Sequence, residues 1–234
     1  MLLGIVIAFF AIAIGIDAIV MMKRKRQAAA ISAASLYQGF FDEKTANMPR
    51  GLKYDSGHTW AHMDEYGRIR IGVDDFLQHI MGPISGIIMK NPGDFVKKGE
   101  VFMSLIQDGK RLELRSPVNG KVRVANEKLN VDASVINVSP YDQGWVYLIE
   151  ADDFKRDSRL MYHTDSATRW INSEFLRMKD FFSSLPTTSL QGTPAIVMQD
   201  GGSLKDQILH EFGPEIWEEF QNGFLDKKNE QHHA

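Results

Sequence analysis

The 234-residue chain is 44% hydrophobic and has a formal net charge of −3, a composition that suits a folded protein with at least one buried core. Because there is no basic excess, the charge gives no support to nucleic-acid binding. The absence of cysteine excludes disulfides, thiolate metal ligands, iron–sulfur ligation by this chain and cysteine nucleophiles.

Residues 1–22 form an apolar segment that predicts a membrane-spanning helix. The segment is long enough to cross a hydrocarbon core of about 30 Å, and Asp17 is its only charged residue. The basic residues 23–26 follow it, whereas a cleaved signal peptide carries its positive charge before the apolar run. By the positive-inside rule we expect an uncleaved single-pass anchor in the inner membrane, with the N-terminus outside and the body in the cytoplasm.

Asp17 leaves two interpretations open, because a carboxylate within a membrane is expensive. Its side chain either reaches the membrane interface or makes a polar contact with a helix of another subunit. Beyond the anchor and its basic stop, which together cover 1–26, an alanine-rich stretch can continue the helix until Pro49 and Gly51 end it. We therefore expect a helical stalk or linker over 27–53.

From residue 67 to residue 150 the chain consists of short β-type runs separated by Gly, Pro, Asn and Asp. This pattern is typical of a compact β sandwich or barrel. The expected strands are 68–72, 84–89, 101–107, 111–115, 121–125 and 145–149.

The β region contains an internal repeat, in which Pro83 and Gly86 match Pro117 and Gly120 at one offset of 34 residues (117 − 83 and 120 − 86). Two similar halves predict a quasi-twofold β domain. The halves meet at residues 107–110 (Gln-Asp-Gly-Lys), where Asp-Gly between strand residues predicts a tight hairpin with a projecting tip.

Helices are expected after residue 153. Five apolar residues recur at spacings of four, three, four and three, which predicts that they lie on one face of a helix that begins near residue 165 or 166. These residues are Ile171, Phe175, Met178, Phe182 and Leu185.

A loop and two shorter helices follow in the prediction. Ser203 is expected to cap a helix that carries Leu204, Ile208 and Phe212, and Pro214 begins the next helix. The aromatic residues of that last helix can pack on the β region, but we expect them to leave surface for another subunit. They are Trp217, Phe220 and Phe224.

Several short motifs occur in order between Tyr54 and about Asp153. They are Tyr54 with His58-Thr59-Trp60, the segments 72–78 and 93–100, Ser116-Pro117-Val118-Asn119-Gly120, Val124-Ala125-Asn126 and Pro140-Tyr141-Asp142-Gln143-Gly144-Trp145. In order and spacing they resemble the H protein of the glycine cleavage system. The resemblance implies a mainly-β, lipoyl-domain-like barrel-sandwich hybrid over 54–153, here with an N-terminal transmembrane helix and a C-terminal α-helical extension over 154–234.

The resemblance also implies a modification site. In that family a lysine at the hairpin tip carries lipoate, nine residues after the position of Glu100 and seven before that of Ser116, and both counts lead to 109 (100 + 9 and 116 − 7). Gly109 stands there, followed by Lys110. Because a one-residue shift in a hairpin turns the side chain to another face, we expect no cofactor, with lipoate on Lys110 as the alternative.

No other constellation predicts a catalytic or metal site. His58 and His62 have the spacing of two metal ligands on a helix, but their segment is predicted to be strand or loop and no third ligand is apparent. Asp74 and Asp75 fit the start of a helix better than a pair of catalytic carboxylates.

Two hypotheses for the function result. The first is a non-catalytic, membrane-anchored subunit that serves as a scaffold or docking module in a larger membrane complex, for which a redox assembly is an analogy. The alternative is a lipoyl carrier modified at Lys110. The expected partners are the lipid bilayer, through residues 1–22, and other protein subunits, without nucleic acid or a small-molecule substrate. The candidate contacts to those subunits are Asp17, Trp217, Phe220 and Phe224.

Overall fold

The structure is a computed structural model that describes residues 40–185 and 204–226, which belong to one compact unit. The predicted anchor with Asp17, residues 27–39 of the predicted stalk, Ser203 and residues 227–234 lie outside these ranges, so the predictions for them stay predictions. Residues 40–53 are not helical, which corrects the predicted stalk there: they form a short strand, turns and the start of a second strand. Within the two ranges, no helix combines the length and the apolar character that crossing a membrane requires.

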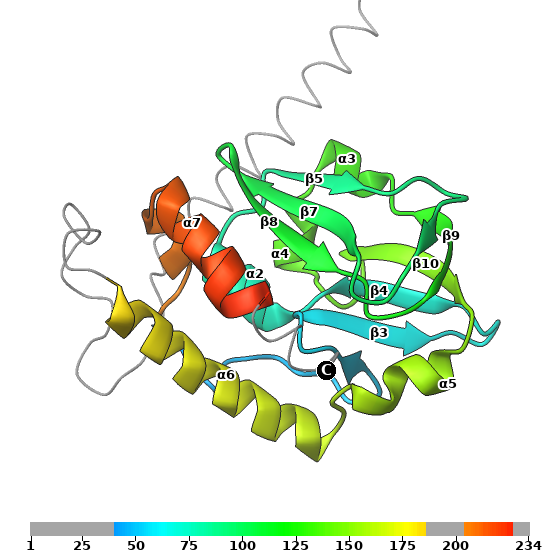
Figure 1. Ribbon diagram of the computed structural model, residues 1–234, viewed down its shortest axis with the longest axis horizontal. Coiled ribbons are helices and arrows are strands. Elements are labelled where there is room, and N and C mark those ends of the chain that lie inside the picture. Colours follow the sequence, from blue (N-terminus) through cyan, green and yellow to red (C-terminus); the bar gives the residue numbers. More distant parts are fainter. Residues whose placement is uncertain (1–39, 186–203, 227–234) are drawn as a thin grey trace, which may run out of the picture. The chain divides into compact units, whose positions relative to one another are not determined.

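Short strands with three short helices among them make up most of the described chain, and the last part consists of helices with one further short strand (Figure 1). The strands are β1 (Phe40–Phe41), β2 (Lys53–Tyr54), β3 (Thr59–Met63), β4 (Ile69–Val73), β5 (Gly86–Met89), β6 (Phe95–Val96), β7 (Val101–Gln107), β8 (Lys110–Arg115), β9 (Gly120–Ala125), β10 (Trp145–Ala151) and β11 (Leu204–Lys205). The α-helices are α2 (Asp75–Met81), α3 (Lys128–Val131), α4 (Val135–Val138), α5 (Phe154–Asp157), α6 (Asp165–Ser184) and α7 (Pro214–Phe220). Two 3-10 helices, η1 (Ser158–Leu160) and η3 (Ile208–Glu211), and the π-helix η4 (Gln221–Asp226) complete them.

Two antiparallel sheets make up a mainly-β sandwich. The larger has six strands in the order β2-β3-β4-β10-β9-β6, and the smaller has three in the order β5-β7-β8. Alternate residues of β4, namely Ile69, Ile71 and Val73, are fully buried, which is the period expected of a strand with one face in a core. Strands cover each of the runs that the sequence predicts, with ends that differ by a few residues.

The hairpin between β7 and β8 has the predicted tight turn. Asp108 and Gly109 both have positive φ angles, of 48° and 79°, and Gln107 pairs with Lys110 across the turn. Two consecutive positive φ angles suit the right-handed twist of a two-residue hairpin, which explains the Asp-Gly sequence.

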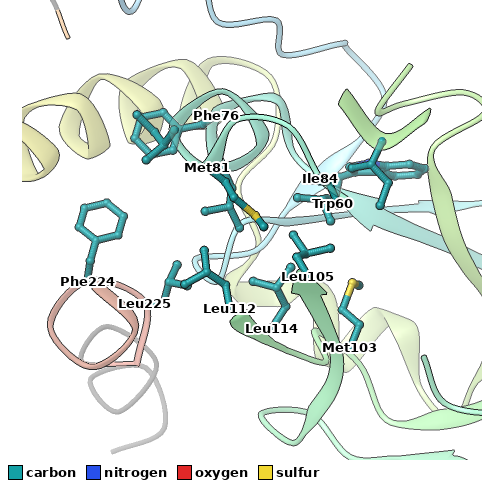
Figure 2. Packing of buried hydrophobic residues seen from close by; sticks show 14 of the residues in the cluster. Trp60, Phe76, Met81, Ile84, Met103, Leu105, Leu112, Leu114, Phe224 and Leu225 are labelled. Atoms are coloured by element: carbon teal, nitrogen blue, oxygen red, sulfur yellow. The ribbon is translucent and has the colours of Figure 1, made fainter. Parts of the chain in front are cut away.

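The C-terminal helices complete the hydrophobic core of the sandwich. The apolar face predicted for α6 is buried, including Phe175 and Phe182, which confirms that helix. Phe224 of η4 lies on the same side of the core as Phe76 of α2, while Leu225 approaches Leu112 of β8 (Figure 2). The β region and the extension therefore share one core.

The prediction of one helix that carries both Leu204 and Ile208 is wrong for the first half of that segment. Leu204 belongs to strand β11, which pairs antiparallel with β1 through Phe41, and only residues 208–211 are helical, as a 3-10 turn. Gln207 between them has a left-handed backbone with φ of 61°, which interrupts any helix. The partner strand lies far away in the sequence, so the local pattern of apolar residues could not indicate it.

Candidate functional site

The tip of the β7–β8 hairpin is the place where the family resemblance expects a modified lysine. Gly109 lies at the turn with open space around it, since a Cβ built there would meet nothing within 4 Å. Lys110 is the first residue of β8 and is half-buried. Its Nζ donates hydrogen bonds to the carbonyl oxygens of His210, at 3.1 Å, and Phe212, at 3.0 Å.

The surroundings of Lys110 are those of a structural contact. Nζ lies 4.8 Å from the centre of the Trp217 ring, a cation–π distance. Burial lowers the pKa of Lys110, although the carboxylate of Asp108 acts in the opposite direction. The two carbonyls that it caps are at the C-terminal end of η3, where helices leave acceptors unsatisfied and favour a cation.

The C-terminal segment also covers the outer edge of β8. The Gln221 side chain accepts a hydrogen bond from the backbone N–H of Glu113, at 2.8 Å, and donates one to its carbonyl, at 3.2 Å. Arg115 pairs with Asp226 at 2.9 Å. An amide side chain that satisfies both backbone groups of a strand residue blocks that edge against another strand, so the hairpin is sealed along its length.

Trp217, Phe220 and Phe224 do not form an exposed docking surface, and the prediction that they do is wrong. Their exposed fractions are 2%, 0% and 1%, and the Trp217 indole donates to the Leu209 carbonyl at 2.9 Å. The prediction that these aromatic residues lie on helices is confirmed, since they belong to α7 and η4. They are buried because they pack against β8 and α6 of the same chain, and not against another subunit.

The other candidate residues have structural positions. His62 is exposed on β3, whereas His58 is buried against Asp74, and no cluster of metal-ligating side chains occurs in residues 40–185 and 204–226. Asp74 caps α2 by accepting a hydrogen bond from the Leu77 N–H at 2.9 Å, which confirms the predicted helix start.

The sequence motifs lie together in the fold. A Cβ at Gly72 would come within 2.7 Å of the Trp60 ring, so the ring requires glycine there, and the Trp60 indole donates to the Pro140 carbonyl at 3.1 Å. Asn126 donates to the carbonyl of Trp145 at 2.7 Å, which holds the start of β10. These motif residues thus make contacts that hold the larger sheet to the loops around it.

Residues 52–173 match the family model described as Glycine cleavage H-protein, and this range is more than half of the 234 residues. The chain belongs to the glycine cleavage H-protein family. The match ends within α6, so the segment 204–226 lies beyond it. Members of this family are carrier components of a multi-enzyme system, interact with its other components and are not themselves catalytic, as expected for this chain.

Individual relatives agree with the family match. The glycine cleavage system H protein of Chlorobium phaeobacteroides is 34% identical over 115 residues, which are 90% of that protein and 49% of this chain. That of Halalkalibacterium halodurans is 35% identical over 116 residues, 90% of the protein and 50% of this chain. A crystal structure of the Mycobacterium marinum H protein is similar over 54% of this chain and 99% of that one, with 20% identity and a TM-score of 0.47.

The contacts that seal the hairpin were missed in the sequence. Lys110 and its acceptors are separated by 100 and 102 residues, and Glu113 is 108 residues from Gln221. The excess of aromatic residues after residue 203 was the one available signal, because such residues must be buried somewhere.

Proposed function

We propose that this chain is a non-catalytic, partner-binding component of a multi-enzyme system, and that its hairpin tip carries no lipoate. The observation that supports an unmodified tip is the engagement of the Lys110 ammonium by the carbonyls of His210 and Phe212 beneath the segment 204–226. Gly109, at the position where the family resemblance expects lysine, has no amine to modify.

The chemistry of the site favours an ammonium over an amide. Lipoylation would replace the charged donor of Lys110 by a neutral amide with one N–H and a long acyl chain. At least one of the two carbonyls at the end of η3 would lose its donor. Water can replace the donor at the exposed His210 carbonyl, whereas an unsatisfied acceptor costs up to about 1–3 kcal/mol where it is buried, which favours the ammonium at the Phe212 carbonyl. The acyl chain would also have to pass the Trp217 ring, which the ammonium now faces.

A lipoyl carrier modified at Lys110 is the second candidate, and family membership favours it. The relatives are named as H proteins, and the comparisons support a carrier component better than the scaffold of a redox complex. Lys110 lies next to the turn, so its amine would become available if residues 210–212 moved away from it. This function therefore requires release of the C-terminal segment.

Mass spectrometry of the Lys110 peptide tests the proposal. We expect the full-length protein, expressed in cells that lipoylate a co-expressed H protein with lysine at the family position, to show an unmodified Lys110. Lys110→Arg is the matched variant, because arginine keeps the charge but cannot be amidated. A lipoyl mass on Lys110 in a substantial fraction of molecules, absent from the variant, would establish the carrier function instead.

The proposal places the protein on the inner membrane. Residues 1–22 would form the anchor, and the basic residues 23–26 would keep the body in the cytoplasm. Within the bilayer, Asp17 would contact a helix of a partner. Protease added outside spheroplasts is then expected to leave the chain beyond residue 30 intact, with a periplasmic protein as the control for access. Rapid cleavage within the β region would reverse the proposed topology.

A further inference from the structure

Two histidines join the C-terminal extension to the β region, and each stands between two carboxylates. The first is His58, whose Nδ1 is 3.0 Å from Asp74 and whose Nε2 is 3.6 Å from Glu174 of α6. The side chains of His58 and Asp74 are 0% exposed and that of Glu174 is 1% exposed. Water therefore cannot screen these charges.

The row of charges continues from Glu174 into the C-terminal segment. Glu174 pairs with Arg177 at 2.7 Å, and Arg177 donates to the Phe224 carbonyl at 2.9 Å. The guanidinium also lies 3.7 Å from the centre of the Phe224 ring, and that ring stacks on His58. His58 is thus in contact with both α6 and η4.

The second histidine, His79, makes an equivalent link at the other end of α2. Its Nδ1 is 2.7 Å from Asp206, in the segment after β11, and its Nε2 is 3.7 Å from Asp75. The ring stacks on Phe41 of β1, and the backbone N–H of Gln207 donates to the His79 carbonyl at 2.8 Å. This link fixes the chain just before η3, whose carbonyls hold Lys110.

We propose that these two links, the His58 clasp with Asp74 and Glu174 and the His79 clasp with Asp75 and Asp206, form a pH-dependent lock. When the histidines are protonated, each cation joins a carboxylate of the β region to a carboxylate of the extension. When they lose the proton, the cation shared by each pair of carboxylates is gone, Glu174 keeps its ion pair with Arg177, and the lock weakens.

The surroundings of both rings support a role for the charged form. Burial alone lowers the pKa of His58, but Asp74 and Glu174 outweigh it, and the pKa is raised above 6.5. Burial likewise opposes the charged form of His79, and Asp206 and Asp75 raise its pKa above 6.5. The direction is the same at both clasps.

The sign of the pH dependence follows from these directions. A group whose pKa is raised in the folded protein contributes its full stabilisation below the ordinary value, and the contribution is lost as the pH rises through the raised value. The lock is therefore strongest in mildly acidic solution and weakens in alkaline solution.

Few other charges face the two rings among the described residues. Around His58, the N-cap of α2 supplies Asp74, and α6 supplies Glu174 with Arg177 behind it, while three aromatic rings lie against the imidazole. These rings are Phe76, Trp170 and Phe224. Around His79 the charged groups are Asp75 and Asp206, with Phe41 on the ring face.

The consequence of the lock concerns the hairpin. The His79 clasp holds Asp206, four residues before His210, whose carbonyl accepts from Lys110. Loosening this segment uncovers Lys110 and the edge of β8. The pH of the surroundings thus controls whether the hairpin is sealed, whichever function the tip has.

Hydrogen exchange of the full-length protein in detergent, read by mass spectrometry, tests the lock. We expect the protection of residues 204–226, corrected for intrinsic exchange and compared with β4, to fall about tenfold or more between about pH 6 and about pH 9. The double variant His58→Gln/His79→Gln is expected to show low protection at both pH values. His62→Gln, on the exposed face of β3, is the matched control and should behave as the wild type.

A second variant covers the case in which the double variant does not fold. Asp206→Asn removes one carboxylate from the partly exposed His79 clasp and leaves His58 intact, so the pH at which protection is lost should move down. Equal wild-type protection at both pH values would overturn the proposal, as would an unchanged midpoint in Asp206→Asn. A fall of the same size in the double variant as in the wild type would do so too.

Discussion

Replacing Trp217 with alanine is expected to lower the free energy of unfolding by about 3–5 kcal/mol. Trp217 is 2% exposed, and its indole donates to the Leu209 carbonyl, so the truncation leaves a cavity and an unsatisfied acceptor. It also removes the ring that faces Lys110. Because the extension and the β region share one core, the loss should appear in the cooperative transition. Urea denaturation followed by far-UV circular dichroism measures it.

Leu176→Ala is the matched control for this prediction. Leu176 lies on α6 but is 63% exposed, so its truncation should change the free energy of unfolding by no more than about 0.5 kcal/mol. Similar small effects for both variants would mean that the segment around Trp217 does not belong to the cooperative core. In that case these aromatic residues would again become candidates for binding another subunit.

Replacing Gly120 with alanine is expected to cost about 2–3 kcal/mol or more. A Cβ at Gly120 would lie 2.3 Å from the Glu150 carbonyl oxygen and 2.8 Å from the Ala151 Cα. Both atoms belong to the backbone of β10, which pairs with β9 at this point, so the clash can be relieved only by separating the two strands. The same denaturation experiment measures the change.

The internal repeat supplies the control for Gly120. Gly86 occupies the equivalent position at the start of β5, but a Cβ there would meet Ile106 at 3.6 Å, an ordinary contact distance. Gly86→Ala should therefore be neutral within about 0.5 kcal/mol, or slightly stabilising because alanine restricts the unfolded chain. Equal costs for the two variants would show that glycine is required by the repeat itself and not by the contact with β10.

Some properties of this chain are local in the sequence, and others depend on its tertiary structure. Short β-type runs between turn residues indicated β4, the spacing of the apolar residues indicated α6, and the Asp-Gly pair indicated the hairpin turn, because each of these features depends on residues within a few positions of one another. The family position of the modified lysine could be assigned to Gly109 because the motifs on either side of the hairpin have a fixed spacing from it. The H-protein family was recognisable from the sequence for the same reason.

The contacts between distant segments could not be predicted in this way. Trp217 and Phe224 had the pattern of an apolar helix face, but a pattern does not show whether that face meets β8 and α6 of its own chain or another protein. Lys110 was identified in the sequence as an alternative lipoylation site, but the two carbonyls to which its ammonium donates were not. His58 and His79 gave no local sign that each stands between two carboxylates. Only the tertiary structure decided these points, because burial and charge pairing depend on which segments the fold brings together, and local periodicity carries no information about that.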